Sequence, residues 1–377
     1  MKKVLIFSLA YYPRVGGAEV AIKKITNNIK DIEFHMVTMR FSSADKKKEK
    51  NENVTIHRVG QGSGYFSKIL FIPLAAWEAR RLHKTEKFDA VWVMMSYMLL
   101  PFLLSGLRIP YALTLQEGDT EHHMFRRLRI LPFLPLINRG FRGATVVQVI
   151  SNYLGTWARK RGFTGTLEII PNGCDVFWFG QNILADNRSR FWTQRGIPSN
   201  NIILITTSRL VHKNAVDDVI RALLELPKNI HFVICGEGPL DSYLKNLRKK
   251  LKLSERVHFM GQISNTTLVH YLHASNIFIR PSRSEGMGNS FIEAMAAGLP
   301  VIATQEGGLK DFISPEVAWV VEKNRPDQIA LQIKDILGNP EHTQKVIESA
   351  RNLAVQKYDW QLLAHDMREK VFSRLFT

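Results

Sequence analysis

Two glutamates on either side of a glycine-rich turn give the chain its clearest chemical signal. Glu285 and Glu293 flank Gly286-Met287-Gly288-Asn289, the apolar run Asn276–Ile279 precedes them, and an alanine-rich helical segment follows. Glycines let a backbone approach a ligand closely, and free N–H groups at the start of a helix favour an anion. We expect Glu285 on the loop at the carboxyl end of a strand, and Glu293 in the first turn of the helix. The arrangement predicts a site for a nucleotide diphosphate that carries a sugar.

This segment resembles the Glu-x7-Glu signature of retaining glycosyltransferases, most closely those of glycosyltransferase family 4. The resemblance extends over nearly the whole chain and implies transfer of a sugar from a nucleotide-diphosphate sugar to an acceptor hydroxyl. It implies a catalytic role for Glu285 and donor contacts for residues 286–289 and Glu293. The motifs leave open whether the donor carries UDP or GDP. Synthesis of a bacterial cell-surface polysaccharide or of a lipid-linked glycan is implied by the resemblance alone.

Two cations follow the first strand of the second half of the chain, in Ser208-Arg209-Leu210-Val211-His212-Lys213-Asn214. A guanidinium binds phosphate oxygens with two hydrogen bonds, and an ammonium four residues later adds a point charge. Fixed cations here would stabilise the charge that a leaving nucleotide diphosphate gains. The family has Gly-Arg-Leu and Lys-Gly at these places, so the resemblance gives Arg209 and Lys213 catalytic roles on the diphosphate. Ser208 and Asn214 replace the usual glycines, for which we expect a modest change in loop geometry.

Three further turns are expected to line the donor site. Gly16-Gly17-Ala18-Glu19 follows the first strand and opens a helix. The family's Gly-Gly-x-Glu at this place touches the donor phosphate, whereas for Glu19 itself we expect stabilisation of the helix end. The turn Gly236-Glu237-Gly238-Pro239 shapes a pocket wall or is structural only. After the next strand, Gln262 and Ile263 are expected to meet the base through backbone groups.

Polar residues directly after the apolar run Tyr111–Leu115 are expected near the reacting sugar carbon. They are Gln116, Glu117 and Asp119. Many members of the family have histidine at position 116, and glutamine cannot exchange protons but can hydrogen-bond a sugar hydroxyl. Glu117 or Asp119 could hold the acceptor or stabilise positive charge at the sugar carbon. The segment 171–175 matches the family's Pro-Asn-Gly-x-Asp and is expected to form a hinge.

The sequence contains no Asp-x-Asp motif. A diphosphate bridged by a metal ion would therefore lack its ligands. Helix N-termini together with Arg209 and Lys213 would take the place of the metal. We expect a reaction that requires no metal and no cofactor besides the nucleotide-sugar substrate.

The elements that position these residues form two successive α/β halves, in which apolar runs alternate with helical patterns. Such alternation predicts parallel sheets with right-handed crossovers. Strands are expected at 3–9, 34–38, 54–59, 90–94, 111–115, 146–150 and 167–170, and at 202–206, 231–235, 256–260, 277–279, 301–303 and 317–321. A polar stretch, 180–200, is expected to link an acceptor-binding domain (1–180) to a nucleotide-sugar-binding domain (195–357). In the family resembled, a terminal helix (here 358–377) crosses back to the first of two Rossmann-like domains that face each other across a cleft, the GT-B fold.

The charge balance favours an acidic partner. There are 51 Lys and Arg against 34 Asp and Glu, a net charge of +17, which suits phosphorylated substrates, an anionic membrane surface or nucleic acid. Cys174 and Cys235 are the only cysteines, which fits a reducing cytoplasm and excludes a disulfide framework. We interpret the apolar N-terminus as a buried strand rather than a signal peptide. No apolar run approaches the ~20 residues of a membrane-spanning helix.

Basic residues are interleaved with bulky apolar ones between His122 and Gly143. The basic ones are Arg126, Arg127, Arg129, Arg139 and Arg142, and the apolar ones are Phe125, Leu128, Ile130, Leu131, Phe133, Leu134, Leu136, Ile137 and Phe141. The predicted helix Ser67–Lys84 adds Lys68, Arg80, Arg81 and Lys84 beside Phe71 and Trp77. Such a surface would bind peripherally to the anionic inner face of a membrane and would suit a lipid-linked acceptor. Internal helices with a solvated basic edge are the alternative.

Three other functions remain open. A nucleotide-sugar epimerase could share the two-domain architecture, and it would act on the donor without an acceptor. A nucleic-acid-binding protein is suggested by charge alone, but no recognition motif accompanies that charge, so we expect no nucleic acid partner. A non-catalytic relative is conceivable, although both glutamates, Arg209 and Lys213 are present.

Overall fold

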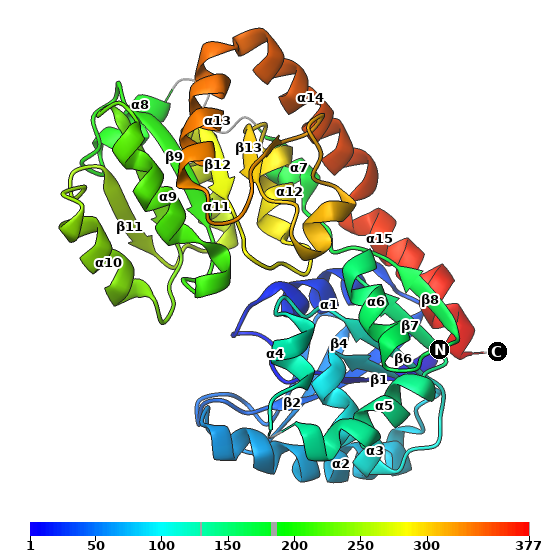
Figure 1. The fold of residues 1–377 in the computed structure, drawn as a ribbon. Coiled ribbons are helices and arrows are strands. Elements are labelled where there is room, and N and C mark those ends of the chain that lie inside the picture. The colour runs from blue at the N-terminus through cyan, green and yellow to red at the C-terminus, as the bar shows by residue number, and fades with distance from the viewer. Residues whose placement is uncertain (129, 182–186, 377) are drawn as a thin grey trace. The chain divides into compact units, whose positions relative to one another are not determined.

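The computed structural model describes residues 1–128, 130–181 and 187–376, which form two compact units (Figure 1). Unit 1 comprises Met1–Asn172 and Trp360–Thr377, and unit 2 comprises Gly173–Asp359. The division falls inside the Pro-Asn-Gly turn, earlier than the polar stretch of residues 180–200 that we expected to link the domains. Within that stretch, residues 182–186 lie outside the described residues, and the rest belongs to unit 2.

Unit 1 is built on a sheet with the strand order β3-β4-β2-β1-β5-β6-β7-β8, in which only the β3–β4 pair is antiparallel. The strands are β1 (Lys2–Phe7), β2 (Ile32–Met39), β3 (Lys48–Asn51), β4 (Val54–Val59), β5 (Ala90–Met94), β6 (Tyr111–Leu115), β7 (Val146–Val149) and β8 (Thr166–Ile169). The helices are α1 (Gly17–Asn28), α2 (Tyr65–Glu86), α3 (Leu99–Ser105), α4 (Glu121–Phe125), α5 (Leu134–Arg142), α6 (Asn152–Lys160) and α15 (Trp360–Asp366), with short helices η1 (Ser96–Met98), η2 (Leu131–Phe133), η6 (Met367–Phe372) and η7 (Ser373–Leu375).

The apolar runs form the strands of unit 1 because parallel strands are covered on both faces. β5 and β6 coincide with the runs 90–94 and 111–115, and every residue of both strands is buried. β3 was not predicted, because its sequence, Lys-Glu-Lys-Asn, is polar throughout. It forms the outer edge of the sheet, where charged side chains oppose pairing with another chain.

The C-terminal segment packs on unit 1, as the GT-B resemblance implied. Trp360, Leu363 and Met367 belong to the same buried core as residues of α1, and α15 lies against α1 (Figure 1). Phe372 meets Phe34 and Trp92 edge to face, at ring distances of 5.7 Å and 5.2 Å. The predicted return of the terminal helix to the first domain is therefore confirmed.

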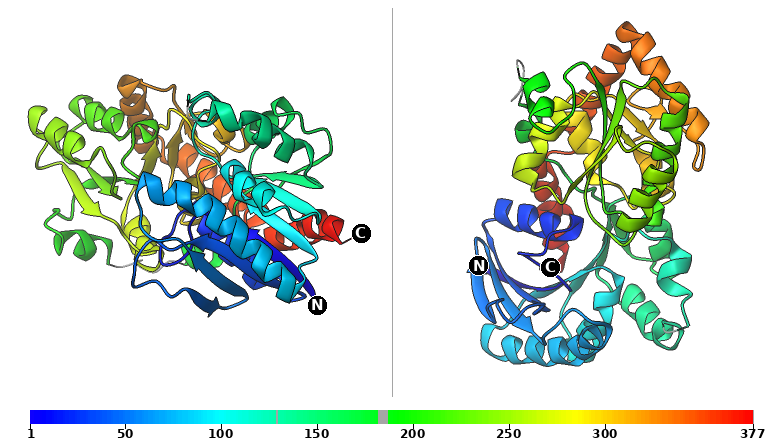
Figure 2. Two further views of the ribbon diagram at one scale, coloured as in Figure 1. Left: turned by 90° about the horizontal axis from the view of Figure 1, so that it is seen from below. Right: turned by 90° about the vertical axis from the view of Figure 1, so that its left-hand side faces the viewer.

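Unit 2 has an entirely parallel sheet with the order β11-β10-β9-β12-β13-β14. The strands are β9 (Ile202–Thr207), β10 (Ile230–Cys235), β11 (Val257–Gly261), β12 (Ile277–Arg280), β13 (Val301–Ala303) and β14 (Trp319–Val320). The helices are α7 (Val176–Gly180), α8 (Arg188–Thr193), α9 (Val216–Ala222), α10 (Asp241–Lys250), α11 (Asn265–Ala274), α12 (Asn289–Ala296), α13 (Pro326–Gly338) and α14 (Pro340–Lys357), with η3 (His212–Asn214), η4 (Leu223–Glu225) and η5 (Gly307–Asp311). Two further views show how the helices cover each sheet (Figure 2).

Candidate active site

Two loops leave the carboxyl edge of the unit 2 sheet from neighbouring strands. From β9 the chain winds outward to β10 and β11, and from β12 it winds the other way to β13 and β14. Ligands bind at such a reversal point, because the loops on its two sides diverge and leave a crevice. The loop after β9 carries Arg209 and Lys213, and the loop after β12 carries Glu285. The three residues predicted to be catalytic therefore lie on adjacent loops.

Arg283, on the loop after β12, binds the segment that follows β9. Its guanidinium lies 3.0 Å from Asp217 Oδ1 and 2.8 Å from Asp218 Oδ2, both at the start of α9. It also donates to the carbonyl of His212 at 2.7 Å, and its backbone N–H donates to the carbonyl of Lys213 at 2.6 Å. These bonds fix the backbone of Lys213 against the loop that carries the first glutamate.

Asn214 holds the loop after β9 in place with its side chain. Its Nδ2 donates to the carbonyl of Arg209 at 2.7 Å, and the residue is buried. The left-handed backbone conformation occurs one residue later, at Ala215, whose φ is 53°. Asn214 thus closes the loop with a hydrogen bond that glycine, usual here in the family, cannot make.

The turn Gly236-Glu237-Gly238 forms the wall beside this loop. A Cβ on Gly236 would stand 1.9 Å from the carbonyl oxygen of Ser208, and one on Gly238 would stand 2.4 Å from that of Leu210. The Leu210 N–H donates to the Glu237 carbonyl at 2.9 Å. Both glycines are needed because the two backbones are in contact, so the turn sets the position of the Arg209 loop.

The carboxylate of Glu285 is held by Arg280, at the end of β12. Arg280 Nη2 lies 2.9 Å from Glu285 Oε2, and the Gly286 N–H donates to the other oxygen at 3.0 Å. Both side chains of the ion pair are almost completely buried. Gly288 has φ +87°, and a Cβ there would stand 2.6 Å from Arg280 Nη2. We expected Gly286 and Gly288 to admit a ligand; at Gly288 the space is filled by the guanidinium.

Glu293 lies in the second turn of α12, not in the first turn as the sequence led us to expect. The helix begins at Asn289, one residue after the left-handed Gly288, and its first turn contains no acidic residue. The register differs because the glycine turn continues to Gly288. Burial raises the pKa of Glu293 to about 7, and the Arg280 charge opposes that rise. Met287 is buried beside this turn.

Gln262 and Ile263 follow β11, two strands away from β9. The Gln262 N–H lies 3.4 Å from Glu237 Oε1, and the Gly236 N–H donates to the Gly261 carbonyl at 2.7 Å. Gln262 is exposed and Ile263 is half-buried. The segment therefore adjoins the glycine turn that supports the Arg209 loop.

In unit 1, the Gly16-Gly17 turn opens α1 after β1. Both glycines are exposed. Glu19 folds back so that its Oε2 accepts the Gly16 N–H at 2.8 Å, and a Cβ on Gly16 would stand 2.8 Å from the same oxygen. Burial raises the pKa of Glu19. Glu19 therefore has the helix-capping role expected for it, and Gly16 makes room for the carboxylate.

The residues after β6 point in different directions. Gln116 is buried, and its Oε1 accepts from Asn172 Nδ2 at 3.1 Å. Glu117 is 2% exposed, its Oε1 accepts the Ser96 N–H at 2.7 Å, and burial raises its pKa. Asp119 is half-exposed, with His123 Nε2 at 3.8 Å. Glu117 thus lies inside unit 1, whereas Asp119 is partly open to solvent.

Two family models match successive parts of the chain. The one described as Glycosyltransferase Family 4 matches residues 15–176, and the one described as Glycosyl transferases group 1 matches residues 188–353. The chain belongs to the family 4 glycosyltransferases. Its Gly16-Gly17 turn falls in the first match, and the Arg209 and Glu285 loops fall in the second.

Relatives of this glycosyltransferase span nearly its full length. A GDP-mannose-dependent monoacylated alpha-(1-6)-phosphatidylinositol monomannoside mannosyltransferase of Corynebacterium glutamicum is 26% identical and covers 96% of both chains. An alpha-monoglucosyldiacylglycerol synthase of Streptococcus pneumoniae is 24% identical over 96% of this chain and 85% of its own. The solved structure of Anabaena Alr3699/HepE in complex with UDP-glucose superposes with a TM-score of 0.82, at 19% identity, over 99% of this chain and 100% of that one. The likeness shows the same GT-B fold of two Rossmann-like domains.

Three residues that hold these loops of the glycosyltransferase in place were not predicted from the sequence. Gly307, after β13, has φ +62°, and a Cβ there would stand 2.1 Å from the Glu285 carbonyl oxygen. That carbonyl accepts the Gly308 N–H at 2.9 Å. A Gly-Gly pair directly after a predicted strand was the available signal, as at Gly16-Gly17. Arg280 and Arg283 gave no such signal, because their partners are set by the fold.

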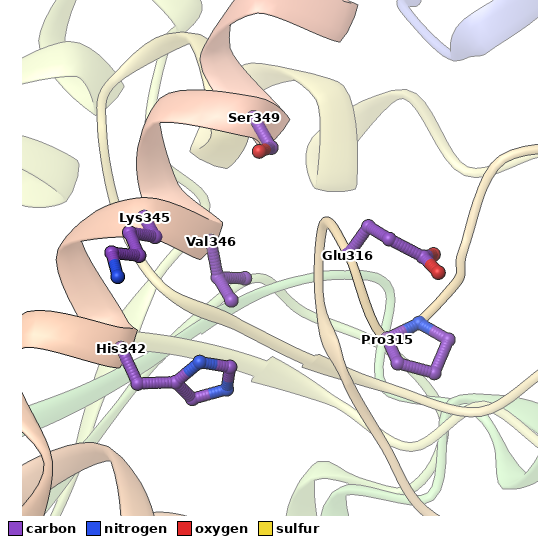
Figure 3. Close-up of a pocket in the computed structure, with 6 residues that line it drawn as sticks. All are labelled: Pro315, Glu316, His342, Lys345, Val346 and Ser349. Atoms are coloured by element: carbon purple, nitrogen blue, oxygen red, sulfur yellow. The ribbon is translucent and has the colours of Figure 1, made fainter.

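Two other features of the glycosyltransferase lie apart from these loops. Among the described residues, one group has metal-binding spacing, namely Glu33, His35 and Glu86, and the Lys3 ammonium already lies 2.8 Å from Glu86. In unit 2, a cavity of about 320 Å³ opens between the segment before β14 and α14 (Figure 3). Its lining includes Glu316 and His342 but none of the predicted site residues.

Proposed function

We propose that the chain transfers a sugar from a nucleotide-diphosphate sugar to an acceptor hydroxyl, with retention of configuration at the sugar carbon and without a metal ion. The observation that carries the proposal is the meeting of the Arg209–Lys213 loop with the Glu285 loop at the reversal point between β9 and β12. The titles of two similar proteins support the donor class: one is GDP-mannose-dependent, and one was solved with UDP-glucose.

Unpaired polar atoms at the same edge of the sheet support a polar ligand. Among the described residues, the hydroxyl oxygens of Thr207, Ser208 and Ser282 are buried without a hydrogen-bond partner. They lie at the ends of β9 and β12 or just beyond them. Buried polar groups are nearly always paired in folded proteins, so such a group marks a place where a partner is expected.

The proposed chemistry needs no protein base. The acceptor hydroxyl attacks the sugar carbon from the face that the diphosphate leaves, so one carbon–oxygen bond forms as the other breaks. The proton of the hydroxyl passes to a phosphate oxygen of the leaving group. Arg209 and Lys213 stabilise the negative charge on that group, and Glu285 stabilises the positive charge that develops at the sugar. Positioning by the two loops supplies much of the remaining acceleration.

Transfer by the purified protein tests this proposal. We expect UDP-glucose or GDP-mannose to raise the melting temperature, and an anomer-resolved NMR spectrum of the product to show the configuration of the donor. Treatment with a chelator should leave turnover unchanged. Inversion, or loss of turnover on chelation that added metal restores, contradicts the corresponding part of the proposal. Conversion of the sugar in the absence of any acceptor would instead identify an epimerase.

We further propose a lipid-linked acceptor, approached from the cytoplasmic face of a membrane. The outer face of α2 carries six exposed apolar side chains: Tyr65, Phe66, Ile69, Leu70, Leu74 and Trp77. The opposite face buries Phe71, Ala75 and Ala79, so apolar side chains lie on both faces of α2. Apolar faces of helices are normally buried against another surface. No described helix has both the length and the apolar character of a membrane span.

Charge is concentrated on the same unit. Basic side chains exceed acidic ones by 14 in unit 1 and by 3 in unit 2, which together give the net charge of +17. Lys68 and Lys84 are exposed on α2, and Arg126 and Leu128 are exposed before η2. By contrast, Phe71, Phe125, Ile137 and Phe141 of the predicted basic face are buried, and Arg129 lies outside the described residues. Two similar proteins have names that include a glycolipid, which supports an anionic bilayer as the partner.

A further inference from the structure

The guanidinium of Arg280 lies at the centre of the Glu285–Glu293 motif. The residue ends β12 and is 6% exposed. One terminal nitrogen binds Glu285 Oε2 at 2.9 Å, and the other donates to Ser290 Oγ at 2.7 Å and to the Thr207 carbonyl at 3.3 Å. The Arg280 side chain, at the end of β12, therefore contacts three neighbouring segments, namely the glycine loop, the start of α12 and the end of β9.

The glycine loop is shaped around this guanidinium. Its plane lies over the Phe291 ring, with a distance of 4.3 Å from the central carbon to the ring centre. The backbone at Gly288 passes so close that a Cβ there would meet both the guanidinium and Phe291, at 2.6 Å and 2.7 Å. Any side chain at this position would displace Arg280 from the glutamate. The loop conformation and the arginine are thus mutually dependent.

Stability alone does not account for a buried arginine here. Taking a guanidinium out of water is costly, and apolar groups of similar volume often serve packing equally well. Burial lowers the pKa of Arg280, and Arg280 Nε is buried without a hydrogen-bond partner among the described residues. The bonds that the guanidinium does make are directed to the motif and to the adjacent strand end.

We propose that Arg280 is a positioning residue, which holds the Glu285 carboxylate toward the sugar of the donor. This inference rests on the proposed function. In this proposal Glu285 binds the sugar half of the donor. The nucleotide half is bound by Arg209, Lys213 and Glu293. Loss of Arg280 should therefore weaken recognition of the sugar more than recognition of the nucleotide.

The test compares binding of UDP-glucose with binding of UDP, or GDP-mannose with GDP, whichever pair binds the wild type. The measurement is made at pH 8.5, where Glu293 of the wild type is largely ionised. For Arg280→Met we expect about 10- to 100-fold weaker binding of the nucleotide sugar, which corresponds to the loss of one charged hydrogen bond between Glu285 and the sugar. Binding of the free diphosphate should change less than about threefold. Turnover should fall by at least about tenfold. Without the Arg280 charge the pKa of Glu293 rises, so the acid limb of UDP binding should move to higher pH.

Arg256→Met is the matched control, since the Arg256 guanidinium bonds only with backbone carbonyls, of Leu223, Leu226, Pro227 and Ile230, in the described structure. It should lower the melting temperature without changing the ratio of the two affinities. Arg280→Lys keeps the charge but cannot reach both Glu285 and Ser290. The pH dependence of UDP binding should therefore match that of the wild type, whereas binding of the nucleotide sugar should stay weak. If a folded Arg280→Met or Arg280→Lys variant loses both affinities equally at pH 8.5, or neither, Arg280 is structural only. If the wild type binds no nucleotide sugar, the proposed function itself is wrong.

Discussion

Among single residues, Glu293 has the ionisation that should be easiest to observe. Burial raises its pKa to about 7, so the folded protein binds this proton more tightly than the unfolded chain does. Its contribution to stability is then complete below about pH 4.5 and is lost as the pH rises through about 7. We expect Glu293→Gln, which cannot ionise, to gain on the order of 1–3 kcal/mol relative to wild type between pH 5 and pH 8. Urea unfolding at both pH values measures the gain, and a constant difference between the two proteins would refute the assignment.

Substitution of Gly288 should cost folding free energy for two reasons, backbone strain and steric overlap, and a second glycine allows the two to be distinguished. Its backbone is left-handed, with φ +87°, and its Cβ position is filled by Arg280 and Phe291. Gly298 has a similar φ of +75° but open space around its Cβ position. We expect Gly298→Ala to cost about 1 kcal/mol of folding free energy, and Gly288→Ala about 2–4 kcal/mol with loss of donor binding. Equal melting temperatures for the two variants would show that Gly288 is not confined by the guanidinium.

Between elements, the contact that matters most for the site is the one Arg283 makes from the β12 loop to α9. Removing one partner of a largely buried ion pair leaves the other charge uncompensated. We expect Arg283→Met to destabilise unit 2 by about 2–4 kcal/mol and to weaken nucleotide binding, because the loop that carries Lys213 loses the guanidinium bonds to the His212 carbonyl and to Asp217 and Asp218. Arg325→Met is the control, since its pair with Asp327 is exposed and should contribute little. Calorimetric titration with UDP or GDP distinguishes the two variants; unchanged affinity in Arg283→Met would mean that the loops are independent.

For the whole molecule, the uneven charge and the apolar face of α2 lead to a prediction about membranes. We expect the protein to float with anionic vesicles at low salt and to be released as salt screens the attraction. Combined replacement of Phe66, Leu70 and Trp77 by serine should reduce bound protein at least tenfold, given about 1.5 kcal/mol or more for each side chain inserted.

The control for flotation is a variant with serine at Leu224 and Leu331, which are exposed apolar residues of unit 2. It should float like the wild type, and neither variant should lose thermal stability, because the replaced side chains contact solvent. Flotation of the α2 variant at the wild-type level would rule out this face as the membrane contact.

The local sequence pattern was sufficient to predict most of the helices and strands and the type of site. The continuous segment 280–289 contains a strand end, a glycine turn and a helix start, so neighbouring residues alone predict these features. The boundaries of β5, β6 and β13 agree with the apolar runs because buried parallel strands are apolar throughout. The polar edge strand β3 shows the limit of this rule, since pairing with β4 forms it rather than burial.

The sequence by itself determined the fold class, the two α/β halves and the residues on the site loops, because each of these depends on short-range spacing. Only the tertiary structure decided which side chains form hydrogen bonds and ion pairs with one another. In the folded chain Glu117 points inward and binds Ser96, and Glu293 lies in the second turn of α12. Arg280 and Arg283 bind residues that are up to 73 positions away along the chain. The physical reason is that a parallel sheet brings the carboxyl ends of distant strands to one edge, where partners are chosen by proximity in space.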